Sequence, residues 1–166
     1  TSRGLGDVYK RQLKDILTGL YSRNAYDEWE KDHLHPQRTA IAMFDLNNLK
    51  KCNDKFGHEA GDAYLKTASE MITNAFAKEN TIYRIGGDEF CVIMPDAQES
   101  SIKGAMERLS ELQEQYNVAK NSVKVEIACG YAFYDDNVDC SFVDTRKRAD
   151  TYMYENKRRL KERGER

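Results

Sequence analysis

The stretch that decides the fold is Thr81-Ile-Tyr-Arg-Ile-Gly-Gly-Asp-Glu-Phe-Cys-Val-Ile-Met94. Apolar runs flank the turn-forming tetrad Gly86-Gly87-Asp88-Glu89, and this arrangement predicts a β-hairpin. Glycines allow positive φ and let another group approach the backbone N–H donors, whereas carboxylates on a rigid hairpin can hold a divalent metal ion. A tip that binds both an anion and a metal suits a nucleoside triphosphate. The alternative, for the tetrad alone, is an ordinary polar hairpin end.

Composition predicts one globular domain with a sizeable core, because the chain has 166 residues, of which 40% are hydrophobic and 33% charged. The formal net charge of −2 gives no global attraction to nucleic acid or anionic lipid. No apolar run approaches the roughly 20 residues that span a membrane, and no signal-peptide pattern opens the chain. We therefore expect a cytoplasmic domain without membrane contact of its own, whether or not a longer protein is anchored.

Metal-binding and redox patterns are absent from the cysteines and histidines. The four cysteines are scattered without a C-x-x-C pair, and the three histidines lack metal-ligand spacing on any one element. Cys91 and Cys129 fall inside expected strands, where cysteine acts as a small buried hydrophobe. A reduced protein is favoured over a disulfide framework, and no zinc site is expected.

Apolar periodicity predicts the order helix, strand, helix, hairpin, helix, strand, helix. Residues 1–14 are expected to be a linker or a remnant outside the domain, and residues 15–166 to form it. The expected elements around the hairpin are a helix from Asn24 to about His33 with Ser22 as N-cap, a buried strand over Thr39–Phe44, a helix after Gly57-His58, a second helix through Ile102 and Leu112, a half-buried strand from Val123 to Phe133, and a helix from about Phe142 to Lys161.

This order suits an α+β fold, a ferredoxin-like α/β plait of the nucleotide-cyclase or palm type, with a mainly antiparallel central sheet and helices packed on one face. In such a plait the first strand and the hairpin are neighbours. Asp45 ends the first strand and Asp88 lies on the hairpin tip, so the fold would bring two distant carboxylates together. Taken alone, Asp45 is equally a strand-end turn residue.

Two converging carboxylates suit Mg²⁺, with Mn²⁺ as an alternative ion, because Mg²⁺ takes one or two protein carboxylates and fills its octahedron with waters and substrate phosphates. A pair of ions about 3.5–4 Å apart can activate an attacking hydroxyl and stabilise the leaving oxygen of a phosphoryl or nucleotidyl transfer.

The polar run after Asp45 adds groups that could bind the rest of a nucleotide. Lys50 could meet phosphate oxygens, and Asn53 and Asp62 could complement guanine, whose N1–H and N2–H₂ donors suit a carboxylate. Adenine would leave that carboxylate without donors. Each residue also has a simpler interpretation: a solvated lysine, a helix cap or turn, and a first-turn carboxylate favoured by the helix dipole.

The last expected helix ends in a basic stretch. Lys157 and Lys161 are spaced i,i+4, so they share one helix face and could reach a triphosphate if the helix packs beside the hairpin. The alternative is a solvated helix face.

Four collinear segments together resemble the GGDEF family of diguanylate cyclases, over about residues 15 to 161. The segments are Asp15-x-Leu-Thr-Gly-Leu-x-x-Arg23; Phe44-Asp45 through Lys50, Asn53-Asp54, Gly57-His58 and Gly61-Asp62; Arg84-Ile-Gly-Gly-Asp-Glu-Phe90; and Ala149-Asp150 with Met153-Tyr154 and Lys157. The resemblance implies a nucleotidyltransferase that condenses two GTP molecules, held on two facing copies of the domain, to cyclic di-GMP and two pyrophosphates. It also implies a sensor or dimerisation domain in the full-length protein and no nucleic-acid partner.

The resemblance also implies roles for individual residues. The metal ligands would be Asp45, the Leu46 carbonyl and Asp88. The groups acting in catalysis would be Asp88, which helps deprotonate the attacking 3′-hydroxyl, Glu89, which supports the turn, and Lys50, which stabilises developing charge. The substrate-binding residues would be Asn48, Leu49, Lys50, Lys157 and Lys161 at the phosphates, Gly86 and Gly87 at the tip, and Asn53, Asp62 and His58 at guanine.

The chain departs from the family pattern at several positions. Asn47 stands where aspartate is common and Leu49 where phenylalanine is common, and Leu160-Lys161 replaces Gly-Arg, so charge is kept but bidentate phosphate geometry is lost. Ala77-Lys-Glu-Asn80 stands where R-x-x-D confers product inhibition, so we expect no tight inhibition there.

An active diguanylate cyclase is the leading hypothesis. The alternative is a weak or inactive GTP-binding module that regulates or dimerises with a partner. A third possibility, another palm-type polymerase or nucleotide cyclase, accounts for the carboxylate pair but not for all four segments.

Overall fold

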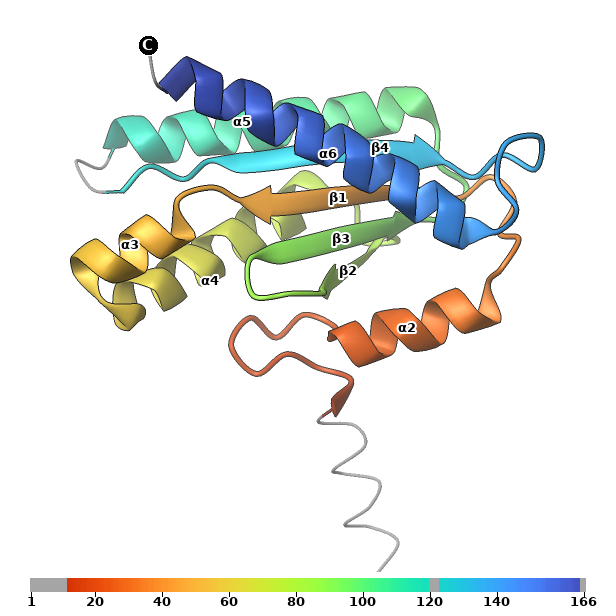
Figure 1. Ribbon diagram of the computed structural model, residues 1–166, viewed down its shortest axis with the longest axis horizontal. Coiled ribbons are helices and arrows are strands. Elements are labelled where there is room, and N and C mark those ends of the chain that lie inside the picture. Colours follow the sequence, from red (N-terminus) through yellow and green to blue (C-terminus); the bar gives the residue numbers. More distant parts are fainter. Residues whose placement is uncertain (1–11, 120–122, 165–166) are drawn as a thin grey trace, which may run out of the picture.

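The computed structural model describes residues 12–119 and 123–164 (Figure 1). Four strands form one antiparallel sheet in the order β2-β3-β1-β4. The strands are β1 (Ala40–Leu46), β2 (Thr81–Arg84), β3 (Glu89–Met94) and β4 (Ile127–Phe133). β1 is central and buried along its whole length, which explains its unbroken apolar sequence. The predicted α+β plait with an antiparallel sheet is confirmed.

Helices cover both faces of the sheet, and the expectation that they pack on one face was wrong. The helices are α2 (Arg23–Asp32), α3 (Leu49–Phe56), α4 (His58–Ala75), α5 (Glu99–Ala119) and α6 (Phe142–Gly164). α4 and α5 lie behind the sheet in Figure 1, where they pack on Ala42 and Phe44; α6 and α2 pack on Ile41 and Met43 from the other side. Because side chains alternate along β1, a strand apolar at every position needs cover on both faces.

α3 is the helix that the sequence analysis did not predict. Cys52 is its only buried residue, and with eight residues the helix is too short for its apolar positions, Leu49, Cys52 and Phe56, to show a sustained helical period. Asn48 precedes it in the left-handed conformation with φ 68°, and Gly57, with φ 90°, separates it from α4. This backbone turns the chain sharply after β1 and again before α4, so α3 lies beyond the end of β1 and packs against α4 (Figure 1).

The other predicted elements agree with the structure to within a few residues. The Ser22 hydroxyl accepts a hydrogen bond from the Ala25 amide and caps α2 as expected. β4 begins at Ile127 rather than at residue 123, because the N–H groups of Val125 and Glu126 donate to the side chains of Asn117 and Tyr64 instead of to a strand.

The expected linker lies largely outside the described residues, although Leu13 and Lys14 already pair with the segment at Tyr21 and Ser22. Within the two described ranges, no helix has both the length and the apolar character needed to cross a membrane.

Candidate functional site

The end of β1 meets the tip of the β2–β3 hairpin. Asp45 lies opposite Glu89 in the β1–β3 register, and one residue on, the Leu46 amide donates to the Asp88 carbonyl at 2.9 Å. The tip is closed by the amides of Ile85 and Gly86, which both donate to the Glu89 carbonyl. The structure therefore places Asp45 and Asp88 side by side, as the predicted topology requires.

The tip glycines do not use the conformational freedom that the sequence analysis attributed to them. Neither has positive φ; among the described glycines only Gly19 and Gly57 do. A Cβ at Gly86 would lie 3.3 Å from Glu89 Cβ, which is tight, whereas one at Gly87 would meet nothing within 4 Å. A side chain at Gly86 would thus need Glu89 to shift by a few tenths of an ångström, whereas Gly87 leaves open space at the tip.

Asp45 is buried, with 6% of its surface exposed. Its Oδ2 accepts a hydrogen bond from Lys157 Nζ at 2.7 Å, and its Oδ1 is a buried oxygen without a hydrogen-bond partner. Burial raises the pKa of Asp45 and the charge of Asp88 raises it further, whereas the bond from Lys157 opposes both. Asp45 Oδ1 is therefore a buried acceptor that neither a hydrogen-bond donor nor a cation satisfies.

The donor set at this point fits a hard divalent ion. No cluster of three or more His, Cys, Asp or Glu side chains suited to a metal occurs in the described part of the chain. Mg²⁺ needs only one or two carboxylates when waters and phosphates complete its coordination. Asp45 and Asp88 supply two, and the partnerless Asp45 Oδ1 is an oxygen that an ion would satisfy. These residues therefore fit Mg²⁺ or Mn²⁺ delivered with a phosphate ligand.

Glu89 lies opposite Asp45 in the β1–β3 register, so the two share a face of the sheet. It lines a small cavity of about 140 Å³ together with Arg23 and Asp150. Burial raises the pKa of Glu89, and the charges of Asp45 and Asp150 raise it further.

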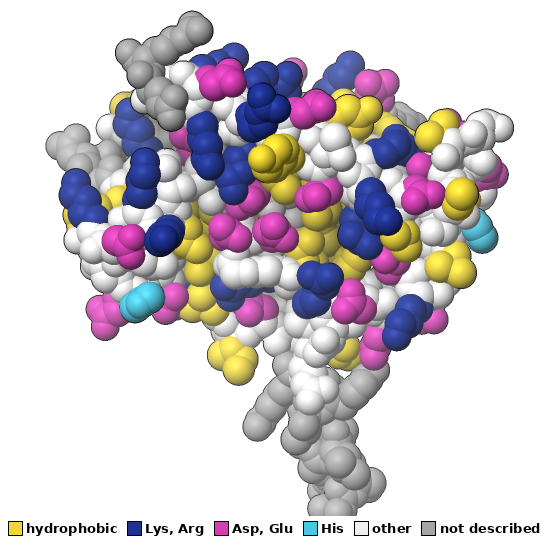
Figure 2. All heavy atoms as spheres, viewed as in Figure 1, with side chains coloured by type: hydrophobic (Ala, Val, Ile, Leu, Met, Phe, Trp, Pro, Cys, Tyr) yellow, Lys and Arg dark blue, Asp and Glu magenta, His cyan; other side chains and the backbone are white. Residues whose placement is uncertain are grey.

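A hollow of about 640 Å³ opens beside Asp88, between the end of β1, α3 and the last turns of α6. Its lining residues are Leu46, Asn47, Asn48, Leu49, Lys50, Lys51, Asp88, Glu126, Lys157, Leu160, Lys161 and Gly164. Every residue predicted to face phosphate from the β1–α3 loop or α6 is among them. Asp45 lies just behind this lining, where Lys157 reaches it. Figure 2 shows Lys and Arg side chains gathered over the C-terminal half of α6, with acidic side chains nearby on the same face.

The residues predicted to read guanine lie outside that lining, at the corner between α3 and α4. A Cβ at Gly61 would come within 1.7 Å of Asn53 Oδ1, so the Asn53 amide lies directly over the first turn of α4. Asp62 follows Gly61 and is exposed, as is His58 at the start of the same helix. The structure thus places Asn53 against Gly61, the residue before Asp62, and leaves this group outside the lining of the hollow beside Asp88.

A hydrogen-bonded clamp that the sequence analysis missed holds the loop after β1. The amide of Asn47 donates to the Glu126 carbonyl at 2.8 Å, and its side-chain Nδ2 donates to Glu126 Oε1 at 2.9 Å. The buried Tyr64 hydroxyl donates to the Asn47 carbonyl at 2.7 Å and accepts from the Glu126 amide at 3.0 Å. This clamp fixes the direction in which Asn48 and the start of α3 face the hollow.

A second support joins the Asp15 turn to the hairpin tip. Arg84 Nη1 pairs with Asp15 Oδ1 at 3.1 Å, and Arg84 Nη2 donates to the Gly87 carbonyl at 2.8 Å. Arg23 Nη1 donates to the Ile85 carbonyl at 3.2 Å. The motif residues Asp15, Arg23 and Arg84 carried the family resemblance without an assigned role; here they hold the tip in place.

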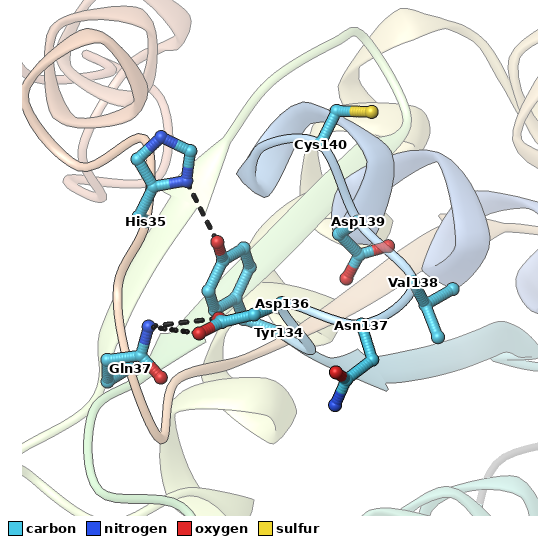
Figure 3. A pocket seen from close by; sticks show the side chains of 8 residues that line it. All are labelled: His35, Gln37, Tyr134, Asp136, Asn137, Val138, Asp139 and Cys140. Atoms are coloured by element: carbon cyan, nitrogen blue, oxygen red, sulfur yellow. Dashed lines mark hydrogen bonds between the residues drawn. The ribbon is translucent and has the colours of Figure 1, made fainter.

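Another hollow, of about 510 Å³, lies at the opposite end of β1 (Figure 3). There His35 Nδ1 lies 2.9 Å from the Tyr134 hydroxyl, and Gln37 Nε2 donates to Asp136. None of the three partnerless buried side-chain atoms found in the described residues belongs to it: these are Asp45 Oδ1, Asn47 Oδ1 and Arg84 Nε. The unmet hydrogen-bonding capacity lies at the Asp45 end instead, which favours that end as the functional site.

Comparison with known proteins agrees with this geometry. The chain matches the family model described as diguanylate cyclase, GGDEF domain, over residues 12–163. Diguanylate cyclase DgcZ of Escherichia coli is 29% identical over 155 residues, which cover 89% of this chain and 51% of DgcZ. Cyclic di-GMP phosphodiesterase NbdA of Pseudomonas aeruginosa is 31% identical over 133 residues, which cover 76% of this chain and 17% of NbdA.

Solved structures share the fold. The GGDEF domain of DgcB from Caulobacter crescentus, crystallised in complex with c-di-GMP, has a TM-score of 0.72 at 23% identity, covering 88% of this chain and 90% of that chain. The chain belongs to the GGDEF family of diguanylate cyclases, a nucleotidyltransferase-type family of cyclic di-GMP signalling. It spans about half or less of the length of the curated relatives DgcZ and NbdA, of which the first is named a diguanylate cyclase and the second a cyclic di-GMP phosphodiesterase.

Proposed function

We propose that this chain is an active diguanylate cyclase domain that condenses two GTP molecules to cyclic di-GMP and two pyrophosphates. The observation that carries the proposal is the meeting of Asp45 and Asp88 beside a lysine-lined hollow, with a buried carboxylate oxygen left unpaired. Two adjacent carboxylates repel each other and three lysines around one concave surface do the same, so this arrangement costs stability. A turn with a purely structural role has no need of it.

The β1–α3 loop and α6 would bind the triphosphate. Lys50 at the start of α3 and Lys157 and Lys161 on α6 enter the hollow from two sides, so they can neutralise phosphate charge. Mg²⁺ held by Asp45, the Leu46 carbonyl and Asp88 would supply Lewis-acid polarisation of the phosphate oxygens.

Asp88 would act at the reacting hydroxyl. It lines the hollow next to the open space at Gly87, so a 3′-hydroxyl can approach it without displacing a side chain. There it would accept the proton as the oxygen attacks the α-phosphorus. Lys50 would stabilise the charge that develops on the phosphate. Because a cyclic dinucleotide needs two triphosphates arranged head to tail, one domain supplies half of the reacting assembly and a second copy supplies the rest.

The α3–α4 corner would select the base. Asn53 and Asp62 present an amide and a carboxylate to the Watson–Crick edge of guanine, with the exposed His58 one turn away. Adenine would offer an acceptor where the carboxylate needs a donor, so we propose GTP as the substrate.

Purified chain incubated with GTP and Mg²⁺ tests the proposal, with cyclic di-GMP measured by chromatography over a series of protein concentrations. We expect product formation to rise more steeply than protein concentration, because two loaded domains must meet. Asp88→Ala should bind GTP without turnover and serves as the negative control. GTP binding by the unaltered chain with no product at high concentration would instead support the regulatory GTP-binding module, and absence of GTP binding would contradict both.

The family's product-inhibition stretch is altered here. Ala77 and Asn80 border a hollow of about 290 Å³ that also includes Arg108. Neither side chain offers the charge that an anionic dinucleotide needs at those two positions. We propose that cyclic di-GMP does not inhibit through them, and tight product binding that depends on Ala77 and Asn80 would refute this.

A further inference from the structure

Lys157 is bonded to the carboxylate that we propose as a metal ligand. Its ammonium group donates to Asp45 Oδ2 at 2.7 Å, and only 23% of the Lys157 side chain and 9% of the Asp45 side chain are exposed. The pair is therefore largely shielded from solvent, and its attraction is stronger than that of an exposed surface pair.

Because Lys157 is bonded to Asp45, it competes with a divalent ion for that carboxylate. A carboxylate has only two oxygens, so an ion bound to either oxygen of Asp45 would lie within about 7 Å of the ammonium group and be repelled by it. On Oδ2 the ion would also have to replace the hydrogen bond itself. Lys157 and a free metal ion thus compete for the same negative charge.

Other lysines in the hollow are placed differently. Lys50 is exposed at the start of α3, and Lys161 is exposed one helical turn beyond Lys157. Among the described residues, Asp45 forms its side-chain ion pair with Lys157 alone. The competing charge is therefore specific to one residue on α6 and is not a general property of the basic surface.

A triphosphate offers Lys157 another partner. Lys157 lines the hollow beside Asp88, and a lysine ammonium on its flexible four-carbon stem can exchange one anion for another without backbone movement. A bound triphosphate carries several negative charges beside this ammonium group. Transfer of Lys157 from Asp45 to phosphate would free Asp45 at the moment when phosphate oxygens become available as further metal ligands.

We propose that Lys157 makes metal binding at Asp45 depend on the nucleotide: it competes with a free divalent ion and yields when a triphosphate binds. The inference rests on the proposed function of the hollow, and it adds a selectivity role for Lys157. Bare ions are excluded, whereas the metal–nucleotide complex is accepted. While the ion is absent, the same ammonium group offsets the repulsion between Asp45 and Asp88.

Titration of Mn²⁺ alone, without nucleotide, tests the competition directly in the full chain. We expect Lys157→Gln to bind Mn²⁺ roughly fivefold or more tightly than the unaltered chain, as measured by calorimetry or by electron paramagnetic resonance of free Mn²⁺. Lys157→Arg keeps the charge and should resemble the unaltered chain. Arg158→Gln removes an exposed charge from the neighbouring position on α6 and should also change nothing.

A second titration, with a non-hydrolysable GTP analogue plus Mn²⁺, measures nucleotide affinity, which the same substitution should change in the opposite direction. Lys157→Gln should bind the analogue more weakly than the unaltered chain, because the phosphates lose a cation. A purely structural role for Lys157 would move both affinities in the same direction and would overturn the inference.

Two further results separate this inference from the proposed function. Mn²⁺ affinity in Lys157→Gln that is equal to or weaker than that of the unaltered chain, including no binding by either, overturns the inference. Failure of the unaltered chain to bind the GTP analogue overturns the proposed function instead. The Mn²⁺ affinities, measured without nucleotide, can still be compared between the two proteins.

Discussion

Gly61→Ala separates base recognition from folding in this domain. The added methyl carbon would lie 1.7 Å from Asn53 Oδ1 and 2.7 Å from Asn53 Cγ. Ordinary contact needs about 3.5 Å, so the amide must move by roughly 1.5 Å or more. The obstacle is the end of a side chain, which can rotate away at little cost. Alanine is also a better helix former than glycine by up to about 1 kcal/mol, so we expect stability to be kept or slightly raised.

The cost should fall on nucleotide binding. A displaced Asn53 amide leaves part of the base edge unpaired, which costs about 1–3 kcal/mol, or about 5- to 150-fold in the GTP dissociation constant. Calorimetry with GTP and urea unfolding of the same protein measure the two effects separately. Gly104→Ala is the matched control, because its methyl group would make only an ordinary 3.4 Å contact with Arg108 on α5, away from the site.

Asn53→Ala completes the design as a double-mutant cycle. If Gly61→Ala acts only by displacing the amide, the double variant should bind GTP no more weakly than Asn53→Ala alone. Unchanged GTP affinity in Gly61→Ala, with the fold intact, would refute the base-reading role of Asn53. Additive losses in the double variant would show that Gly61 acts by some other route.

Three further predictions concern recognition of the guanine base, the hydrogen-bonded clamp around Tyr64, and the half-buried Glu89. Asp62→Ser should narrow the ratio of GTP to ATP affinity, and an unchanged ratio would count against Asp62 as a base reader. Tyr64→Phe leaves the Asn47 carbonyl and the Glu126 amide without their shared hydroxyl; we expect a loss of about 1–3 kcal/mol in unfolding free energy, checked by urea melts, with weaker GTP binding. Burial raises the pKa of Glu89 in the folded protein, so the folded state binds this proton more tightly than the unfolded state does. The contribution of Glu89 to the free energy of unfolding is therefore complete below the usual carboxyl pKa and is lost as pH rises through the raised, folded-state pKa. Glu89→Gln should therefore be more stable than the unaltered chain near neutral pH, with the difference shrinking in acid; a difference independent of pH would contradict this.

Topology could be predicted from the sequence because apolar periodicity encodes it. The unbroken apolar run of β1 and the hairpin around Gly86 predicted neighbouring strands, and neighbouring strands place Asp45 close to Asp88. The same run in β1 called for helices on both faces, which the expectation of one covered face overlooked. α3 was missed because its apolar positions, Leu49, Cys52 and Phe56, extend over only eight residues, which is too short a stretch to establish a helical period.

The finer parts of the site depend on side-chain contacts between distant segments. Glu126 belongs to a stretch expected to alternate as a strand, where its place was on the polar face, so its bonds to Asn47 could not be foreseen. The pairing of Lys157 with Asp45 likewise depends on how α6 packs across β1. Spacing alone showed that Lys157 and Lys161 share a helix face, but not which of them meets the carboxylate.

The central claim is that Asp45 and Asp88 together hold one divalent ion where the end of β1 meets the tip of the β2–β3 hairpin. A crystal structure with Mn²⁺ and a non-hydrolysable GTP analogue, with Mn²⁺ located by anomalous scattering, tests it most directly. The account predicts a peak about 2.0–2.3 Å from a carboxylate oxygen of each residue, with the triphosphate in the hollow beside Lys50. A nucleotide-bound ion that contacts neither carboxylate, or a triphosphate bound elsewhere, would contradict it.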